Sequence, residues 1–325
     1  MNLHRKQFTS LALAAIATGF WGSALAQGAY PTKTVTMVVP TAAGGTTDLS
    51  ARMLAQALAP VLGQSVIVDN KGGGNGNIAA SIVKRAEPDG YTVFMQYSGY
   101  HVISPHITKQ KQWDQADFQP VANVISAPQI IVVRNDLPVK TLPELMAYAK
   151  ANNTNMGSYA PGSYPQMVAD QANRTEGTKI LTVNYRGESP MWIDVASGQL
   201  QVAIGSYQAF NTVATRGVKA IGVTGSYRCP KLPDVPTLVE QGVQGRLVQL
   251  EGGLPLMAPA GTPEAVLKLL SQVVVEGAET ARAAQIRETF AIPNKPKDLA
   301  ATRADWERDV PVWIKLAVDL GIKLD

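Results

Sequence analysis

Short apolar runs alternate with helical patterns along most of this 325-residue chain. The runs VTMVV (35–39), SVIVD (65–69) and YTVFMQ (91–96) are apolar and bounded by turn residues, as buried strands are. Between them, residues 48–62 and 78–86 carry apolar side chains three and four positions apart, which predicts helices. This order of elements predicts an α/β fold with mainly parallel sheets.

A second series of the same kind starts at the strand-like run QIIVV. Further strands are predicted at ILTVN, QLQVAIG and VKAIGVTG, with helices at ELMAYAKAN and from about Pro165 and Pro190. The strand-like run GGLPLMAP, a helix after Thr262, and a helical segment at 298–320 that Pro311 should kink or split complete the chain. Two such series without a flexible linker predict two lobes joined by strands, and a cleft between lobes is a natural ligand site.

Residues 1–26 have the pattern of a cleaved secretory signal peptide. Arg5 and Lys6 supply positive charge, an apolar stretch follows, and the run ALA at 24–26 predicts a cut after Ala26. The apolar stretch is shorter than the roughly 20 residues that a membrane-spanning helix needs. We therefore expect an exported, periplasmic protein.

Composition argues against several classes of function. Loss of the leader lowers the net charge from +4 to +2, and no run of Lys and Arg is present, so we expect no nucleic-acid partner. Cys229 is the only cysteine, which excludes an internal disulfide, and we expect it to be a small, partly buried residue. His101 and His106 are expected on a loop, without the further ligands that a zinc site requires. We expect no metal, no cofactor and no catalysis.

The glycine-rich run KGGGNGN (71–77) is the feature closest to an enzyme motif. It lies between a strand and a helix, as the dinucleotide-binding pattern G-x-G-x-x-G does. Gly72 and Gly74 fit that pattern, but Asn77 replaces its third glycine, and Asp89 lies in a turn before the next strand. An α/β enzyme using a dinucleotide cofactor stays as one alternative to a binding protein, and a ligand-sensing module outside transport stays as another.

The turn PTAAGGTTD follows the first strand and opens the next helix. Gly44 and Gly45 let the backbone approach a ligand closely. Thr46 and Thr47 add hydroxyl groups, and the unpaired N–H groups at the start of a helix favour an anion. Asp48 either caps the helix, which we favour, or contacts the ligand.

The run GSYAPGSYPQ at 157–166 is a second candidate site of the same kind. Backbone amides with the hydroxyls of Ser158 and Ser163 could hold another carboxylate, while Tyr159 and Tyr164 could flank an apolar or aromatic body. Two such turns, one in each predicted lobe, indicate a ligand held between the lobes.

Several longer segments resemble one family. YPTKTVTMVVPTAAGGTTDLSARMLAQAL, DNKGGGNGNIAA, EPDGYTVFM and SGYHVISP resemble the extracytoplasmic receptors of tripartite tricarboxylate transporters, the Bug or TctC-like family (UPF0065). LPDVPTLVEQG, LMAPAGTP and the closing VDLGIK are similar to the same family, so the resemblance covers nearly all of residues 30–325.

The resemblance implies a two-lobed type II periplasmic-binding-protein fold with a hinge of crossing strands. Lobe 1 would comprise residues 27–126 and 227–325 and lobe 2 residues 127–226, each boundary good to about 15 residues. The resemblance also implies a receptor, expected to be a monomer, whose ligands are mostly mono-, di- or tricarboxylates and some amino acids or related acids, and which delivers them to a large and a small membrane subunit of the transporter. The first loop would bind one carboxylate through backbone amides and bridging water, and the second loop would meet the ligand's other end.

The residues and the resemblance together give one set of expected ligand-binding positions. They are Thr41, Gly44, Gly45, Thr46, Asp48, Ser98, Ser158, Tyr159, Gly162, Ser163, Tyr164, Tyr185 and Ser206.

The chain departs from the family pattern in three places. In the first loop, usually PF-x-PGG, Thr41 and Ala43 replace the aromatic residue and the second proline. In the second loop, residues 164–166 (YPQ) replace a tail that usually ends in histidine. A later strand that often ends in aspartate here ends in Gly205, followed by Ser206. These changes predict a pocket richer in Tyr and Ser and poorer in charge, suited to a less polar or aromatic acid.

The first loop can be tested by filling the space that its glycine leaves. We expect Gly45→Val to weaken carboxylate binding sharply while the fold is retained, because the side chain blocks the approach of the backbone to the ligand. Isothermal titration calorimetry and circular dichroism measure the two effects. Unchanged affinity would remove the first loop from the binding site.

Overall fold

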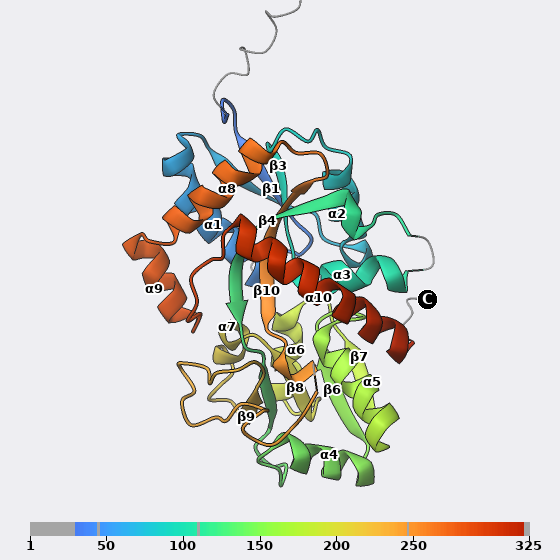
Figure 1. Ribbon diagram of the computed structural model, residues 1–325. Coiled ribbons are helices and arrows are strands. Elements are labelled where there is room, and N and C mark those ends of the chain that lie inside the picture. The colour runs from blue at the N-terminus through green and yellow to red at the C-terminus, as the bar shows by residue number, and fades with distance from the viewer. Residues whose placement is uncertain (1–29, 44–45, 109–110, 246, 322–325) are drawn as a thin grey trace, which may run out of the picture. The chain divides into compact units, whose positions relative to one another are not determined.

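The computed structural model describes residues 30–43, 46–108, 111–245 and 247–321. The predicted signal peptide and its cut after Ala26 lie outside the described residues, as do Gly44, Gly45 and the last residues of VDLGIK. The described residues from Lys33 onward form one compact unit that contains two five-stranded sheets with helices packed against them (Figure 1). The predicted α/β class is therefore confirmed.

The first sheet has the strand order β2-β1-β3-β10-β4. Its central strands are apolar and buried, as the runs VTMVV and YTVFMQ predict. β1 pairs in parallel with β2 and β3, whereas β10 is antiparallel to both of its neighbours. The strand bounds are β1 Val35–Val39, β2 Val66–Asn70, β3 Thr92–Met95, β4 Phe118–Ala127 and β10 Gly252–Pro259.

The second sheet has the order β7-β6-β8-β5-β9 and repeats the same plan. β6 pairs in parallel with β7 and β8, whereas β5 is antiparallel to β8 and β9. The strand bounds are β5 Ile130–Arg134, β6 Thr154–Ser158, β7 Ile180–Asn184, β8 Val202–Gly205 and β9 Val218–Val223.

The helices follow their strands, as the apolar spacing predicts. The α-helices are α1 Thr46–Leu62, α2 Asn77–Lys84, α3 Ser98–Ile107, α4 Leu142–Ala151, α5 Tyr164–Glu176, α6 Glu188–Ala196, α7 Tyr207–Asn211, α8 Glu264–Gly277, α9 Ala281–Thr289 and α10 Leu299–Leu320. Three short 3₁₀ turns are η1 Gly74–Gly76, η2 Gln115–Asp117 and η3 Leu247–Gln249. The Thr141 hydroxyl accepts the Glu144 N–H at 3.2 Å and so caps α4, as predicted.

Two crossings connect the sheets. The chain leaves the first sheet through β4 and enters the second through β5, only three residues later, and it returns through β10. β5 and β10 are antiparallel to both of their neighbours, and each is the first strand that the chain forms after it crosses from the other sheet. Before the return, Leu238 and Leu247 pack into the same apolar cluster as Ile131 and Met156 of the second sheet. The lobe boundaries proposed above stay a prediction.

The last helix, α10, continues through Pro311, so of the two predicted effects of this proline the split is wrong and the kink stays a prediction. Trp313 on α10 lies directly against the backbone of Gly99 in α3, where an added Cβ would come within 2.8 Å of the indole ring. Trp313 also belongs to an apolar cluster that contains Met167 of α5. Trp306 and Val310, which precede the proline, pack against the same cluster, so the helix is held on both sides of Pro311.

Cys229 is 1% exposed and packs in the cluster around Trp192 and Phe210. Burial raises the pKa of its thiol. The residue is more deeply buried than the sequence predicts.

His101 and His106 lie in α3, and not on a loop as predicted. The His101 ring stacks on Trp113 with the ring centroids 4.6 Å apart, and the edge of Phe118 packs on it at 4.9 Å. Neither ring nitrogen of His101 has a hydrogen-bond partner within the part of the chain that the structure describes. Burial lowers the pKa of His101 to about 3, so the imidazole is neutral in the folded protein.

This buried ring makes the protein sensitive to acid. In the unfolded chain His101 titrates near 6.5, so between about pH 6.5 and 3 the unfolded state binds a proton that the folded state does not, and stability falls as the pH falls. We expect His101→Phe to remove about 1.4 kcal/mol per pH unit from the slope of unfolding free energy against pH in the middle of that window. Urea titrations at several pH values measure the slope.

The matched control is His106→Asn, which removes an exposed histidine of the same helix and leaves the ring of His101 in place. Equal slopes in the wild type and His101→Phe would show that the ring finds a proton acceptor or water in solution.

Candidate functional site

The predicted first loop lies where β1 and β2 end side by side. Val39 of β1 is in register with Asn70 of β2, and Thr41 follows immediately. The side-chain amide of Asn70 donates to the Thr41 carbonyl oxygen at 3.0 Å and to Oδ1 of Asp48 at 2.9 Å. Asn70 therefore ties the start of the loop to the first turn of α1. Sequence reasoning missed Asn70, although its place at the carboxyl end of a parallel strand marks it as a candidate.

Asp48 is 1% exposed and lies in the first turn of α1, since the helix begins at Thr46. The prediction that Asp48 is the N-cap is therefore wrong. Its carboxylate pairs with Arg52 one turn later, with Arg52 Nε 3.1 Å from Oδ2 and a terminal guanidinium nitrogen 2.9 Å from Oδ1. The Asp48 carboxylate, near the helix N-terminus, therefore links Arg52 to Asn70, which holds the start of the first loop. Contact of Asp48 with a ligand stays a prediction.

Ser98 is the first residue of α3, after β3 ends. It lies against the return strand β10, because a Cβ added at Gly253 would come within 3.1 Å of the Ser98 hydroxyl. Ser98 therefore lies where the ends of β3 and the crossing strand meet.

The second predicted loop closes on itself. The hydroxyls of Ser158 and Ser163, both buried, lie 2.7 Å apart, and Ser158 donates to the Ala160 carbonyl oxygen at 2.7 Å. The backbone of Gly162, with φ +73°, lies so close to α3 that an added Cβ would be 2.5 Å from Ile107. The two serine hydroxyls thus shape the loop, and their role in holding a carboxylate stays a prediction.

The tyrosines of the second sheet divide into two groups. Tyr164 is 5% exposed, and its hydroxyl donates to the Leu247 carbonyl oxygen at 3.0 Å. Tyr185 donates to Oδ2 of Asp194 at 2.6 Å, and burial with this carboxylate raises the pKa of Tyr185 to about 12. Both hydroxyls are therefore held by the protein itself. Tyr159 lies instead with its ring 5.9 Å from the ring of Tyr97, which extends from the first sheet.

The clearest contact across the two sheets involves a residue that sequence reasoning missed. Glu188, the first residue of α6, is buried. Its Oε2 accepts the Ser206 hydroxyl at 2.6 Å and the Ser206 N–H at 3.2 Å, while the Tyr97 hydroxyl donates to Oε1 at 3.3 Å. Burial raises the pKa of Glu188, and the hydrogen bonds from Ser206 and Tyr97 oppose that rise.

Glu188 changes the charge expected in the pocket. The sequence predicts a pocket poor in charge because Gly205 replaces an aspartate. A Cβ at Gly205 would lie 3.1 Å from the Glu188 carboxyl carbon, so the glycine leaves the space that Glu188 occupies. The replacement of an acid by glycine at a strand end was the signal that another acid fills the position.

A small cavity of about 20 Å³ lies among the predicted residues Ser98, Tyr159, Ser163 and Tyr164, with Tyr97 also in its wall. That volume suits about one water molecule. A ligand of several carbon atoms therefore needs the residues of the two sheets to separate before it enters here.

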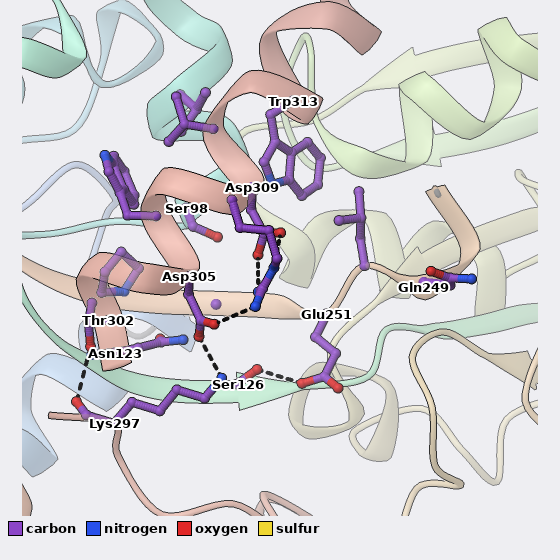
Figure 2. A pocket seen from close by; sticks show the side chains of 17 residues that line it. Ser98, Asn123, Ser126, Gln249, Glu251, Lys297, Thr302, Asp305, Asp309 and Trp313 are labelled. Atoms are coloured by element: carbon purple, nitrogen blue, oxygen red, sulfur yellow. Dashed lines mark hydrogen bonds and ion pairs between the residues drawn. The ribbon is translucent and has the colours of Figure 1, made fainter. Parts of the chain in front are cut away.

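A larger cavity of about 390 Å³ lies beside α10 (Figure 2). Polar pairs surround it: Lys297 with Asp305 at 2.5 Å, and Ser126 with Glu251 at 2.5 Å. Of the predicted positions described here, Ser98 alone lines it. The cavity is therefore separate from most of the predicted site.

Within the described ranges, no three His, Cys, Asp or Glu side chains lie close enough together to hold a metal ion. No described helix combines the length and the apolar character required to span a bilayer.

Two α/β sheets connected by crossing strands, with residues of both meeting at the strand ends, define a periplasmic-binding-protein architecture. The sequence profile of the tripartite tricarboxylate transporter family receptor matches residues 50–292. The chain belongs to this family, as the sequence predicts.

Solved structures of similar proteins agree. An R. palustris protein with adipate has a TM-score of 0.80 and 31% identity, over 90% of this chain and 99% of that one. The periplasmic binding protein BugD has a TM-score of 0.77 and 29% identity, over 90% and 99% of the two chains. MatC from Rhodopseudomonas palustris with bound malate has a TM-score of 0.77 and 26% identity, over 89% and 100%.

The support of the first loop is testable through Asn70. We expect Asn70→Ala to weaken binding of the receptor's carboxylate ligand at least tenfold, because the change releases both Thr41 and Asp48. Asp69→Ala is the matched control, since the described contact of the Asp69 carboxylate is a partly exposed ion pair with Lys71, which contributes little to stability. Calorimetry measures affinity, and thermal unfolding shows that both variants fold. Equal affinities in the two variants would show that the loop does not hold the ligand.

Proposed function

We propose that this chain is a periplasmic receptor that captures a small carboxylate between its two sheets and delivers it to a membrane transporter. The observation that carries this proposal is the meeting of Tyr97, from the end of β3, with Glu188 and Ser206 from the second sheet. In a family of solute-binding receptors, such a contact across strand ends is where a ligand would be enclosed.

The carboxylate class is supported by the first loop. α1 has 17 residues, and its N-terminus follows the carboxyl end of β1, so the helix dipole favours an anion there. Asn70 and Asp48 position this helix start. Adipate and malate, which accompany two of the similar structures, belong to the same ligand class.

The remaining parts of the proposal come from the sequence and the family. The receptor would be exported by a signal peptide cut after Ala26 and would act as a monomer. It would pass its ligand to a large and a small membrane subunit, without catalysis of its own. A dinucleotide-binding enzyme fits less well. A Cβ added at Gly76 would lie only 3.1 Å from Oε1 of Gln96, so a side chain already packs against this glycine. Asn77, in place of the third glycine of the motif, begins α2.

A thermal-shift screen tests the ligand class. We expect at least one aliphatic or aromatic mono-, di- or tricarboxylate to raise the melting temperature saturably, since a ligand at 100 times its dissociation constant stabilises the folded state by about 2.7 kcal/mol. The uncharged amides of the same acids are matched controls that should have no effect. Shifts produced by sugars or amines but by no carboxylate would contradict the proposal, and turnover of the ligand would contradict a receptor without catalysis.

A further inference from the structure

Glu188 is a buried carboxylate whose described contacts include no positively charged side chain. Ser206 and Tyr97 donate hydrogen bonds to it, the Trp192 side chain also lowers its pKa, and no ion pair joins it to a described Lys, Arg or His. A carboxylate removed from water is costly unless a positive charge or several donors compensate. Its position at the start of the nine-residue helix α6 helps to keep it ionised, but supplies no full charge.

The Glu188 carboxylate already occupies the donors at this end of the site. The Ser206 hydroxyl donates to Oε2, and the Ser206 N–H is shared between Oε1 and Oε2. A second ligand carboxylate would need these same donors and would approach an acid at close range, so the two negative charges would repel each other. The second-sheet end of the site is therefore unfavourable for a dicarboxylate.

The same surroundings favour a positive charge. A carboxylate can accept about four hydrogen bonds, and among the described contacts Oε1 receives only two long ones, from the Tyr97 hydroxyl and the Ser206 N–H, each at 3.3 Å. The rings of Tyr97 and Tyr159 lie 5.9 Å apart beside Glu188, and aromatic faces attract cations. Besides burial, the negative charge of Glu188 helps to raise the pKa of Tyr159, which shows how near the two groups are.

We propose that Glu188 determines specificity: it selects a ligand whose far end is a protonated amine, and it rejects a second carboxylate. The ligand class is then an amino-carboxylate, with its carboxylate at the first loop and its ammonium group between Glu188 and the two tyrosine rings. This inference rests on the proposed function, because it assumes the first loop as the carboxylate site.

Two series of acids, matched in chain length, test the inference on the wild-type exported receptor. Hexanoate, adipate and 6-aminohexanoate differ only at the far end, as do butyrate, succinate and 4-aminobutyrate. We expect one of the two series to have the length that fits the site. In that series, calorimetry at pH 7 should show that the amino acid binds at least tenfold more tightly than the monocarboxylate and that the dicarboxylate binds most weakly.

Glu188→Gln removes the charge and keeps the shape. We expect this variant to lose at least tenfold in affinity for the amino acid, to keep its affinity for the monocarboxylate within threefold, and to gain affinity for the dicarboxylate. Glu144→Gln, which neutralises an exposed acid in the first turn of α4, is the matched control and should keep the wild-type order. If Glu188→Gln fails to fold, the order of affinities measured for the three acids on the wild-type protein still tests the inference.

The possible outcomes distinguish the role of Glu188 from the proposed function as a carboxylate receptor. If a dicarboxylate binds most tightly, or if the amine gives no advantage over the methyl group, the role of Glu188 is overturned while the carboxylate receptor stands. Dicarboxylate binding that strengthens as the pH falls would mean that Glu188 shares a proton with the ligand, which also overturns the inference. If no acid of these series or of the wider screen binds, both proposals fail.

Discussion

The antiparallel pairing of β4 with β10 is the constraint on which the rest of the structure depends. The ladder runs from Gly252 opposite Ala127 to Pro259 opposite Phe118, so the outgoing and returning segments of the chain lie side by side over their whole length. Because β5 starts three residues after β4 ends, this ladder sets where the second sheet begins. Residues that follow strands of the two sheets meet, since Tyr97 after β3 contacts Glu188, which also accepts a hydrogen bond from Ser206 after β8.

The binding residues follow from that arrangement and from parallel pairing within each sheet. In parallel sheets, all carboxyl ends lie along one edge, so loops distant in sequence gather there. Thr41 and Asn70 meet at that edge of the first sheet, and Glu188 and Ser206 meet at that edge of the second. Family membership fixes the general task of a solute receptor, and these side chains give the chain its own chemistry.

Much of the fold could be predicted from the sequence, because apolar period and turn residues are local signals. The runs VTMVV and GGLPLMAP are strands within a residue of their predicted bounds. The failures came where packing overrides local preference: α10 continues through Pro311, and His101 is helical. Asp48 is not the cap because α1 begins two residues earlier, at Thr46, and the polar run before the helix does not mark that start. Glu188 was missed because a first-turn acid is ordinary in sequence, and only its meeting with Ser206 and Tyr97 makes it part of a site.

Cys229 gives this receptor a practical property. It is the single cysteine of the chain, it is buried in an apolar cluster, and its thiol is held in the protonated, unreactive form. A cysteine introduced on the surface of either sheet's helices would therefore be the one that reacts with a maleimide dye. Pairs of such dyes, one on each side of the β4–β10 ladder, would report the separation of the lobes in single molecules without any prior removal of native thiols.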